Sequence, residues 1–381
     1  MDISIYIHFP FCLRKCLYCD FNSLADSRIS PEEYVASLLQ EMELRSTRLA
    51  HTITVPTLYL GGGTPSLMAP ELVGRIIDSA DKLFGLATDS EITMEANPGT
   101  LSPARLAGYR TAGVNRLSLG VQSFNDEQLM RLGRIHSARD AKEAYDSARA
   151  AGFANIGLDL IHSLPGETAA IWEADMSMAV ALGPEHISAY DLTVEEGTPF
   201  HLLRSAGRLH LPGEDEAADM FQDTALRLGA AGYEQYEISN FARAGFRSRH
   251  NQVYWRRGAY LGFGAGAHSF SPSPDFGVRW RNAENPERYM EFLAQELLPE
   301  EELTAVGQRH AMAEFFFLGL RMREGVAVEA FRRSFGISPE KAYPYELAEL
   351  LSNGLLERQG DWLRLSGRGM MVANQVFMRF L

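Results

Sequence analysis

The stretch HFPFCLRKCLYCDFNS, residues 8–23, holds all three cysteines of a 381-residue chain. Cys12, Cys16 and Cys19 follow the spacing C-x3-C-x2-C. They come directly after ISIYIHF, residues 3–9, which we predict to be a buried strand because it is a short apolar run. The cysteines therefore stand at the end of a first strand, where side chains from a loop can meet a common ligand.

A disulfide is a poor explanation for the cysteine group, because three cysteines leave one over. The first residues lack the basic segment and long apolar stretch of a secretion signal, so we expect a cytoplasmic protein whose thiols stay reduced. No apolar run approaches the roughly 20 residues that cross a bilayer, so we expect no transmembrane segment.

Two kinds of metal site remain as alternatives. A structural zinc site takes four ligands, and the fourth would be His8 or a distant residue. An iron–sulfur cubane is held by thiolates, and three of them leave one iron open for a substrate or cofactor. We favour the cluster over zinc, and zinc over a purely structural group of thiols.

Strand and helix patterns alternate along the first half of the chain. We predict further strands at 56–60, 91–96, 114–120, 155–161 and 186–192, with helices near 31–50, 70–84, 103–112, 125–151 and 168–182. Such repeated βα units form a parallel sheet. The pattern alone does not decide between an open, doubly wound sheet and a closed barrel.

Polar side chains follow the ends of several predicted strands. The sequence GGGTP at 61–65, Glu95, Gln122, Asp159 and Thr193 all stand there. Turn residues collect at such positions in any case, which is sufficient to explain the glycines. In parallel α/β folds, however, this edge of the sheet is where ligands bind, so we predict the site there.

The periodicity loosens after residue 200, and we divide the chain into three parts. Residues 1–240 form the α/β core, and residues 241–299 form an Arg- and Gly-rich connecting region over the mouth of the barrel. Residues 300–381 form a small, mainly helical domain with a β-wing, which turns at Gln359-Gly360.

The charge balance argues against nucleic-acid binding. The formal net charge is −13, and such a field repels phosphate backbones. The predicted C-terminal domain carries 11 acidic and 10 basic side chains, which does not support a DNA-binding wing. We expect no nucleic-acid partner.

The cysteine motif, placed after the first strand of an α/β repeat, resembles the radical S-adenosylmethionine superfamily. Further motifs occur in order along almost the whole chain: GGGTPS, EANPGTL, NRLSLGVQSF, LDLIHSLPGET, EQYEISNFAR, HNQVYW and YLGFGAGAHSF. Together they are similar to the HemN/HemW branch of oxygen-independent coproporphyrinogen III dehydrogenases and haem chaperones. The resemblance implies a partial (β/α)6 barrel with a small C-terminal, mainly helical domain.

The resemblance also implies cofactors. Cys12, Cys16 and Cys19 would hold a [4Fe–4S] cluster whose open iron is chelated by S-adenosylmethionine, and the cluster's electron would yield a 5′-deoxyadenosyl radical. Ten positions match cofactor contacts of the branch: Tyr6, Tyr18, Gly62, Gly63, Thr64, Glu95, Gln122, Arg134, Asp159 and Thr193.

Two features separate the dehydrogenases from the chaperones. The dehydrogenases resemble C-x3-C-x2-C-x-C, whereas Phe21 stands at the last position here. They also carry a long segment before the first strand, which here begins at about Ile3. Both features imply a haem chaperone that delivers haem to haem proteins such as respiratory enzymes. The alternative is the dehydrogenase itself; a plain electron-transfer protein would not need a cofactor-binding rim.

An acid-free segment, from Phe241 to Ser273, supplies candidate haem contacts. Arginines suit haem propionates, aromatic rings stack on the porphyrin, and imidazole ligates iron. We expect haem contacts from Arg249, His250, Tyr254, Trp255 and Arg256. The alternative is a basic loop in which the histidine makes an ordinary hydrogen bond.

One motif, LIHSLP, departs from the branch, which usually has Tyr-Gly where His162 and Ser163 stand. His162 is either an extra ligand near the cofactor or a plain substitution. The expected partners are haem, haem-accepting apoproteins and a flavodoxin- or ferredoxin-type electron donor. Peripheral contact with a membrane during delivery is a further expectation.

Overall fold

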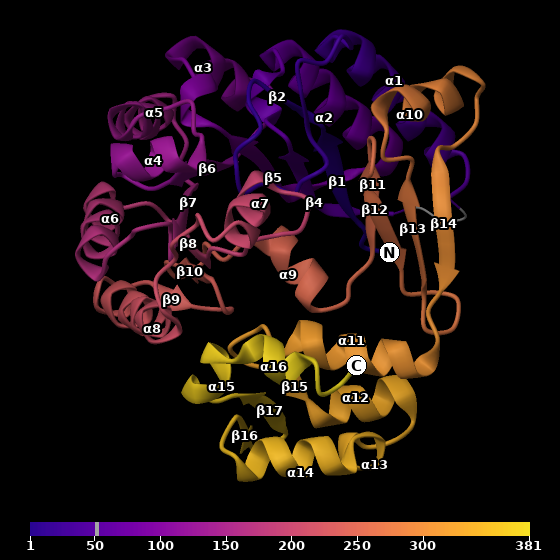
Figure 1. Ribbon diagram of the computed structural model, residues 1–381. Coiled ribbons are helices and arrows are strands. Elements are labelled where there is room, and N and C mark those ends of the chain that lie inside the picture. Colours follow the sequence, from indigo (N-terminus) through magenta and orange to yellow (C-terminus); the bar gives the residue numbers. More distant parts are fainter. Residues whose placement is uncertain (50–52) are drawn as a thin grey trace.

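The computed structural model describes residues 1–49 and 53–381. Its centre is a curved parallel sheet with helices around the outside, and a smaller C-terminal domain lies below it (Figure 1). Among the described residues, no helix combines the length and apolarity needed to cross a membrane.

Six consecutive parallel strands form the core of the sheet and lie side by side in chain order. They are β1 (Ser4–Phe9), β4 (Val55–Gly62), β5 (Leu86–Ala96), β6 (Arg116–Gln122), β7 (Ile156–His162) and β8 (His186–Asp191). The helices between them are α1 (Pro31–Ser46), α2 (Pro70–Phe84), α3 (Pro103–Thr111), α4 (Asp126–Leu132), α5 (Ala138–Ala150) and α6 (Ala169–Leu182).

The sheet is an open barrel, because its outer strands pair with other strands and not with each other within the described chain. Strand β1 pairs in parallel with β11 (Tyr260–Phe263), and β8 pairs antiparallel with β10 (Asn240–Ala242), next to β9 (Glu234–Gln235). This arrangement resolves the choice that periodicity left open and confirms the predicted partial (β/α)6 barrel.

Local signals explain most helix boundaries. Ser30 accepts from the backbone of Glu33 in a capping box that starts α1. The helical pattern expected over 125–151 is two helices, because Gly133 adopts a left-handed conformation (φ 76°) and ends α4. The first helix ends at Ser46, earlier than the predicted end near residue 50, which itself lies outside the described residues.

The strands alternate between an apolar outer face and a polar inner face. On β1, Ile5 and Ile7 are fully buried in the core beneath the helices. The same layer takes Leu58 and Leu60 from β4 and Leu117 from β6. A barrel whose interior is filled by bulky apolar side chains has a solid core without a cavity. Here polar side chains point inward instead, and they leave a cavity.

The region 241–299 lies only in part near the mouth of the barrel, where Asn22 after the cysteine loop donates to the carbonyls of Ala265 and Glu284. Its helix α9 (Arg249–Trp255) lies at the opposite end, where the backbone N–H groups of Arg249 and His250 each donate to Glu91 at 3.0 Å. The His250 ring also bonds Thr57, close to the start of β4. The buried Glu91 carboxylate holds the helix against the amino-terminal ends of the strands.

The rest of that region extends the sheet. Strand β11 is followed by antiparallel β12 (His268–Ser271), β13 (Val278–Asn282) and β14 (Glu300–Ala305). Helix α10 (Pro286–Ala294) connects the last two. The remaining elements of the barrel are β2 (Phe11–Cys12), β3 (Leu24–Ala25), η1 (Pro65–Leu67), η2 (Pro98–Thr100), α7 (Pro199–Ser205) and α8 (Glu214–Ala230).

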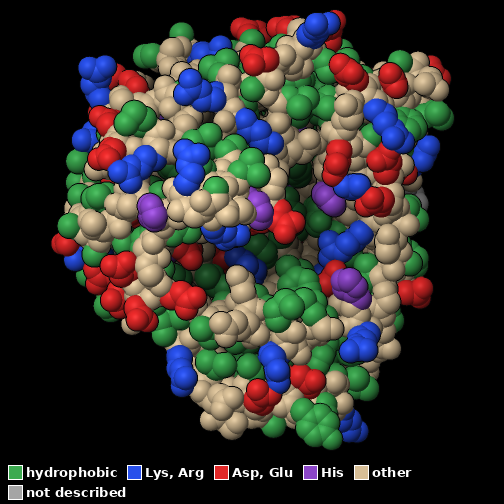
Figure 2. All heavy atoms as spheres, viewed as in Figure 1, with side chains coloured by type: hydrophobic (Ala, Val, Ile, Leu, Met, Phe, Trp, Pro, Cys, Tyr) green, Lys and Arg blue, Asp and Glu red, His purple; other side chains and the backbone are tan. Residues whose placement is uncertain are grey.

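The C-terminal domain has its own apolar core, centred on Phe316 and Phe331. It contains α11 (Gln308–Gly319), β15 (Val326–Ala327), α12 (Val328–Phe335), α13 (Pro339–Ala342), α14 (Pro344–Ser352), β16 (Leu356–Gln359), β17 (Trp362–Leu365), α15 (Gly367–Met371) and α16 (Ala373–Phe377). The predicted hairpin is confirmed, since β16 and β17 pair on either side of Gly360. Figure 2 shows a hollow in the surface between this domain and the barrel.

A buried carboxylate joins α1 to the sheet extension. Glu41 is 0% exposed and accepts from the Tyr289 hydroxyl at 2.7 Å and the Gly264 amide at 2.9 Å. It also accepts from Asn282 at 2.8 Å and pairs with Arg45 at 2.9 Å. Four donors from separate parts of the chain therefore depend on one side chain.

We predict that Glu41→Ala lowers the free energy of unfolding by about 3–5 kcal/mol, because it leaves the Arg45 guanidinium buried and without this partner. Denaturant unfolding followed by circular dichroism measures the change. The control is Glu43→Ala, an exposed position on the same helix, with an expected change within about 0.5 kcal/mol. Equal effects of the two substitutions would contradict the assigned role of Glu41.

Candidate functional site

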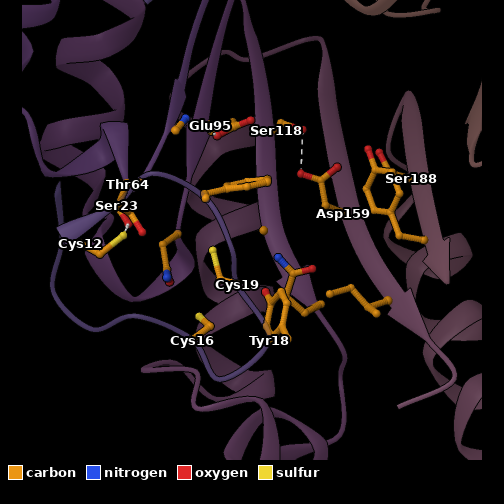
Figure 3. A pocket seen from close by; sticks show the side chains of 18 of the residues that line it. Cys12, Cys16, Tyr18, Cys19, Ser23, Thr64, Glu95, Ser118, Asp159 and Ser188 are labelled. Carbon is orange, nitrogen blue, oxygen red and sulfur yellow. Dashed lines mark hydrogen bonds between the residues drawn. The ribbon is translucent and has the colours of Figure 1, made fainter. Parts of the chain in front are cut away.

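The inward side chains enclose a cavity of about 390 Å³ that extends from the cysteines into the barrel. Figure 3 shows the three cysteines at one end, with Glu95, Ser118 and Asp159 farther along. A volume of this size is typical of small-molecule sites. Because it opens at the carboxyl ends of parallel strands, it lies where the strand pattern predicts.

The cysteine loop is fixed at both of its ends and in its middle. Strands β2 and β3 pair in parallel, with Cys12 opposite Ala25, and so close the base of the loop. Within the loop, the Leu17 amide donates to Leu132 at 3.1 Å, and the Leu17 carbonyl accepts from Phe200 at 3.0 Å. The thiols are therefore held by α4 and α7 as well as by their own strand.

Two side chains from elsewhere in the barrel donate to cysteine sulfur. The Thr64 hydroxyl donates to Cys12 Sγ and the Arg134 guanidinium to Cys16 Sγ, each at 3.4 Å. Burial raises the pKa of Cys19. Donors of this kind stabilise the deprotonated sulfur that a metal requires. No three His, Cys, Asp or Glu side chains of the described ranges converge on a single metal ion.

The glycine motif brings backbone close to the cysteine loop. Gly62 has φ 109°, and a Cβ at this position would lie 2.7 Å from the His8 ring. A Cβ on Gly63 would lie 2.7 Å from the Phe11 carbonyl oxygen. Both positions exclude any larger residue, so the loop after β4 can pass directly beside β2.

Glu95 is tied to the glycine motif and to the neighbouring strand. Its carboxylate accepts from the Tyr59 hydroxyl at 2.8 Å and from the Gly62 amide at 3.1 Å. Burial raises the pKa of Glu95 to about 7, despite these two donors. The side chain therefore titrates near neutrality, and a cationic group in the cavity would favour its charged form.

Asp159 lies on β7, two strands from Glu95, with Ser118 of β6 between them. It accepts from the Ser118 hydroxyl at 2.9 Å (Figure 3). Burial raises the pKa of Asp159 as well. Beside it, Gln122 ends β6 with φ 68°, an uncommon conformation for a residue with a Cβ. The Arg134 guanidinium contacts the same strand end, where it donates to the Gly120 carbonyl oxygen at 2.6 Å.

Most of the residues predicted from the sequence meet at this cavity. Those that line it are Cys12, Cys16, Tyr18, Cys19, Gly62, Gly63, Thr64, Glu95, Gln122, Arg134, Asp159 and Thr193. Tyr6 does not line it: its hydroxyl lies 3.1 Å from His8 Nδ1, and its ring stacks on Tyr59 with centroids 6.1 Å apart.

His162 does not reach the cavity. It lies three residues after Asp159 on β7, so it points to the opposite face, where its ring centroid is 5.3 Å from that of Trp172. Its Nδ1 lies 2.9 Å from the Ser163 hydroxyl. Of the two explanations for this position, the structure favours a substitution in the outer core over a ligand near the cofactor.

The residues expected to contact haem are engaged within the chain. Both ring nitrogens of His250 are bonded at 2.8 Å, to Thr57 and to the Tyr254 hydroxyl, and the side chain is 1% exposed. Arg249 pairs with Asp89 and Arg256 with Glu324. The Arg321 guanidinium stacks over Trp255 at 4.3 Å. From α9 only Asn251 lines the cavity.

Sequence reasoning missed the polar residues deeper in the barrel. Arg116, Ser118, His186 and Ser188 also line the cavity. A usable signal was present, since Arg116 and Ser118 are two positions apart on β6, as are His186 and Ser188 on β8, so each pair shares one face of its strand.

Comparison with known proteins agrees with this geometry. The family described as the radical SAM superfamily matches residues 6–179, and the HemN C-terminal domain matches residues 306–372. A Bacillus subtilis protein named "Heme chaperone HemW" is 38% identical over 379 residues, covering 99% of both chains. The protein of that name from Escherichia coli is 36% identical, covering 100% of this chain and 98% of its own.

The fold is also that of a solved enzyme. The structure of coproporphyrinogen III oxidase (HemN) from Escherichia coli superposes with a TM-score of 0.84, covering 100% of this chain and 90% of its own. At 22% identity, this likeness shows the shared fold only. A radical SAM fold implies a [4Fe–4S] cluster and S-adenosylmethionine as cofactors.

The pKa of Glu95 generates a testable pH dependence. Its pKa is about 7 when folded against an ordinary 4.5, so ionisation opposes folding increasingly as pH rises between these values. We predict that the wild-type protein loses about 1–2 kcal/mol more stability than Glu95→Gln between pH 5 and pH 8, after allowance for solvent screening in the cavity. Denaturant unfolding at both pH values measures the difference.

The control is Glu143→Gln, which alters a side chain that is 68% exposed. Its stability should follow that of the wild type at each pH. If the free energy of unfolding changes equally with pH in the wild type and in Glu95→Gln, the pKa of Glu95 is not raised and the prediction is wrong.

Proposed function

Because the chain belongs to the HemW family of radical SAM proteins, we propose that it is a haem chaperone, which binds haem and delivers it to haem proteins such as respiratory enzymes. The observation that carries this proposal is the similarity to proteins named as haem chaperones over almost the entire length of both chains. Both the cavity region and the C-terminal domain are included in that match.

We propose that Cys12, Cys16 and Cys19 hold a [4Fe–4S] cluster at the mouth of the cavity. The chemistry of the surroundings supports a cluster, since Thr64 and Arg134 already donate to two of the sulfurs. Hydrogen bonds to cluster thiolates adjust the reduction potential. Three thiolates would leave one iron available to S-adenosylmethionine, and a bound cluster would supply the electron for cleavage of this cofactor.

S-adenosylmethionine would occupy the part of the cavity next to the cysteines, between them and the residues deeper in the barrel. Gly62 and Gly63 allow close approach to backbone, and Glu95 and Asp159 offer carboxylates from the two strands that flank β6. A sulfonium and an ammonium group are both cationic, so an acidic pair suits them. Tyr18, Gln122, Arg134 and Thr193 complete the proposed contacts.

The alternative, a coproporphyrinogen III dehydrogenase, finds less support at the cysteine loop. The position that carries a further cysteine in those enzymes is Phe21, which lines the cavity and is 56% exposed. The Phe21 side chain cannot supply the further thiol that those enzymes carry at this position. The similarity to the solved oxidase concerns the fold, which chaperone and enzyme share.

Haem contact at Arg249, His250, Tyr254, Trp255 and Arg256 stays a prediction. In the observed arrangement a haem iron reaches His250 only if the bond to Thr57 or Tyr254 opens. Haem binding there therefore requires a movement of α9 or of Tyr254. The acceptor apoproteins and a flavodoxin- or ferredoxin-type electron donor also stay predictions.

We predict that the anaerobically reconstituted protein binds haem with a defined Soret band and forms no protoporphyrinogen from coproporphyrinogen III. Absorbance titration and product analysis measure the two properties on one preparation. His250→Ala should shift the Soret band, whereas His210→Ala, an exposed position, should not.

Catalytic formation of protoporphyrinogen without haem binding would contradict the chaperone function and support the dehydrogenase function. An unshifted band in His250→Ala, with haem still bound, would remove His250 as an axial ligand and leave the chaperone function in place.

A further inference from the structure

Two basic side chains lie at the closed end of the cavity, below the proposed cofactor region. Arg116 points inward from β6 and His186 from β8, and both line the cavity. They are 2% and 1% exposed, respectively. Neither belongs to the residues assigned to the cluster, to S-adenosylmethionine or to haem.

Arg116 is a buried cation that lacks a bonded partner. Within the described parts of the chain it forms no ion pair and no side-chain hydrogen bond, and its Nε is buried without an acceptor. Among the acidic side chains, Glu91 has the strongest charge interaction with Arg116. Both oxygens of Glu91, however, already accept hydrogen bonds from the backbone of α9. A buried guanidinium that is not hydrogen-bonded is costly, and an anionic ligand would remove that cost.

His186 presents a second donor without a partner. Its Nε2 lies 2.9 Å from the Tyr236 hydroxyl, which itself accepts from the Ser248 amide at 3.3 Å. In the tautomer in which the tyrosine hydroxyl donates to Nε2, the ring proton lies on Nδ1. That Nδ1 is buried and has no acceptor among the described residues.

A glycine leaves space between these two donors. Gly157 lies on β7, the strand between β6 and β8. A Cβ at this position would stand 3.4 Å from His186 Nδ1 and 3.5 Å from Arg116 Nη2. The two nitrogens therefore face the same small volume, which a side chain at 157 would occupy.

The surrounding charges select the ligand. Asp159 and Glu91 lie close enough to act on the Arg116 guanidinium, so a doubly charged anion such as phosphate would be repelled. A single carboxylate matches the two parallel N–H groups of a guanidinium. The imidazole N–H supplies a third donor to it.

We infer that Arg116 and His186, on either side of Gly157, form a subsite for one carboxylate group of a molecule that occupies the cavity beside S-adenosylmethionine. The inference rests on the proposed function only in that this cavity also receives the cofactor. The carboxylate is either a haem propionate or part of a free carboxylic acid.

The first test uses sodium acetate on anaerobically reconstituted protein saturated with S-adenosylmethionine. Acetate should raise the melting temperature of the wild type beyond the effect of sodium chloride at equal ionic strength. Arg116→Met and Gly157→Ala should each weaken the apparent acetate affinity by roughly tenfold or more. Without acetate, Arg116→Met should be as stable as the wild type or more stable, which distinguishes a lost site from a failure to fold.

The matched control is Arg139→Met, since Arg139 is 80% exposed on α5. It should keep the acetate response of the wild type. An equal response of all proteins to acetate and chloride would overturn the subsite.

The second test identifies the source of the carboxylate with haem and haem dimethyl ester, whose propionates are blocked. If the group is a propionate, the wild type binds haem more tightly than the ester, and Arg116→Met binds both equally. If it belongs to a free acid, the wild type binds both equally while the acetate response persists. Failure of haem to bind at all would count against the chaperone function, and the acetate test would still decide the subsite.

Discussion

The inner face of the six parallel strands is polar, and the rest of the structure depends on how these buried groups are satisfied. Polar groups removed from water must find hydrogen-bond partners, or the fold loses stability. Some partners come from within the barrel, as in the Tyr59–Glu95 and Ser118–Asp159 pairs. The remaining groups, including the thiols, face a cavity and are available to ligands. The polar interior thus gives this barrel a cavity for ligands, whereas an apolar interior would form a packed core.

The two ends of the barrel have different tasks. At the carboxyl ends, the cysteine loop and the glycine motif meet and leave an opening. At the amino ends, α9 closes the barrel by donating two backbone amides to Glu91. The arginines next to α9 bind the C-terminal domain: Arg257 pairs with the buried Glu314 at 2.7 Å and Arg256 with Glu324 at 3.1 Å. Arg256 and Arg257 therefore connect the closed end of the cavity to the C-terminal domain. A movement of α9 would change the contacts of both.

Features encoded by neighbouring residues were predictable from the sequence. The order of strands and helices, the cysteine spacing and the polar residues at strand ends all follow from local patterns. The position of α9 was not predictable, because Glu91 and His250 are far apart in the sequence and no local signal pairs them. The outward direction of His162 could have been derived by counting along β7 from Asp159. Arg116 and His186 could have been found in the same way, but their lack of partners is visible only in three dimensions.

The central claim is that three thiolates at the mouth of this cavity leave one iron of a cluster open to S-adenosylmethionine. The most direct measurement is electron–nuclear double resonance of the reduced, reconstituted protein with S-adenosylmethionine labelled with 15N at its amino group and 17O at its carboxylate. We predict hyperfine coupling of both labels to the cluster in the wild type, and no cluster signal in Cys16→Ala. A cluster that forms but shows no coupling at saturating cofactor, or one zinc ion per chain without sulfide, would contradict it.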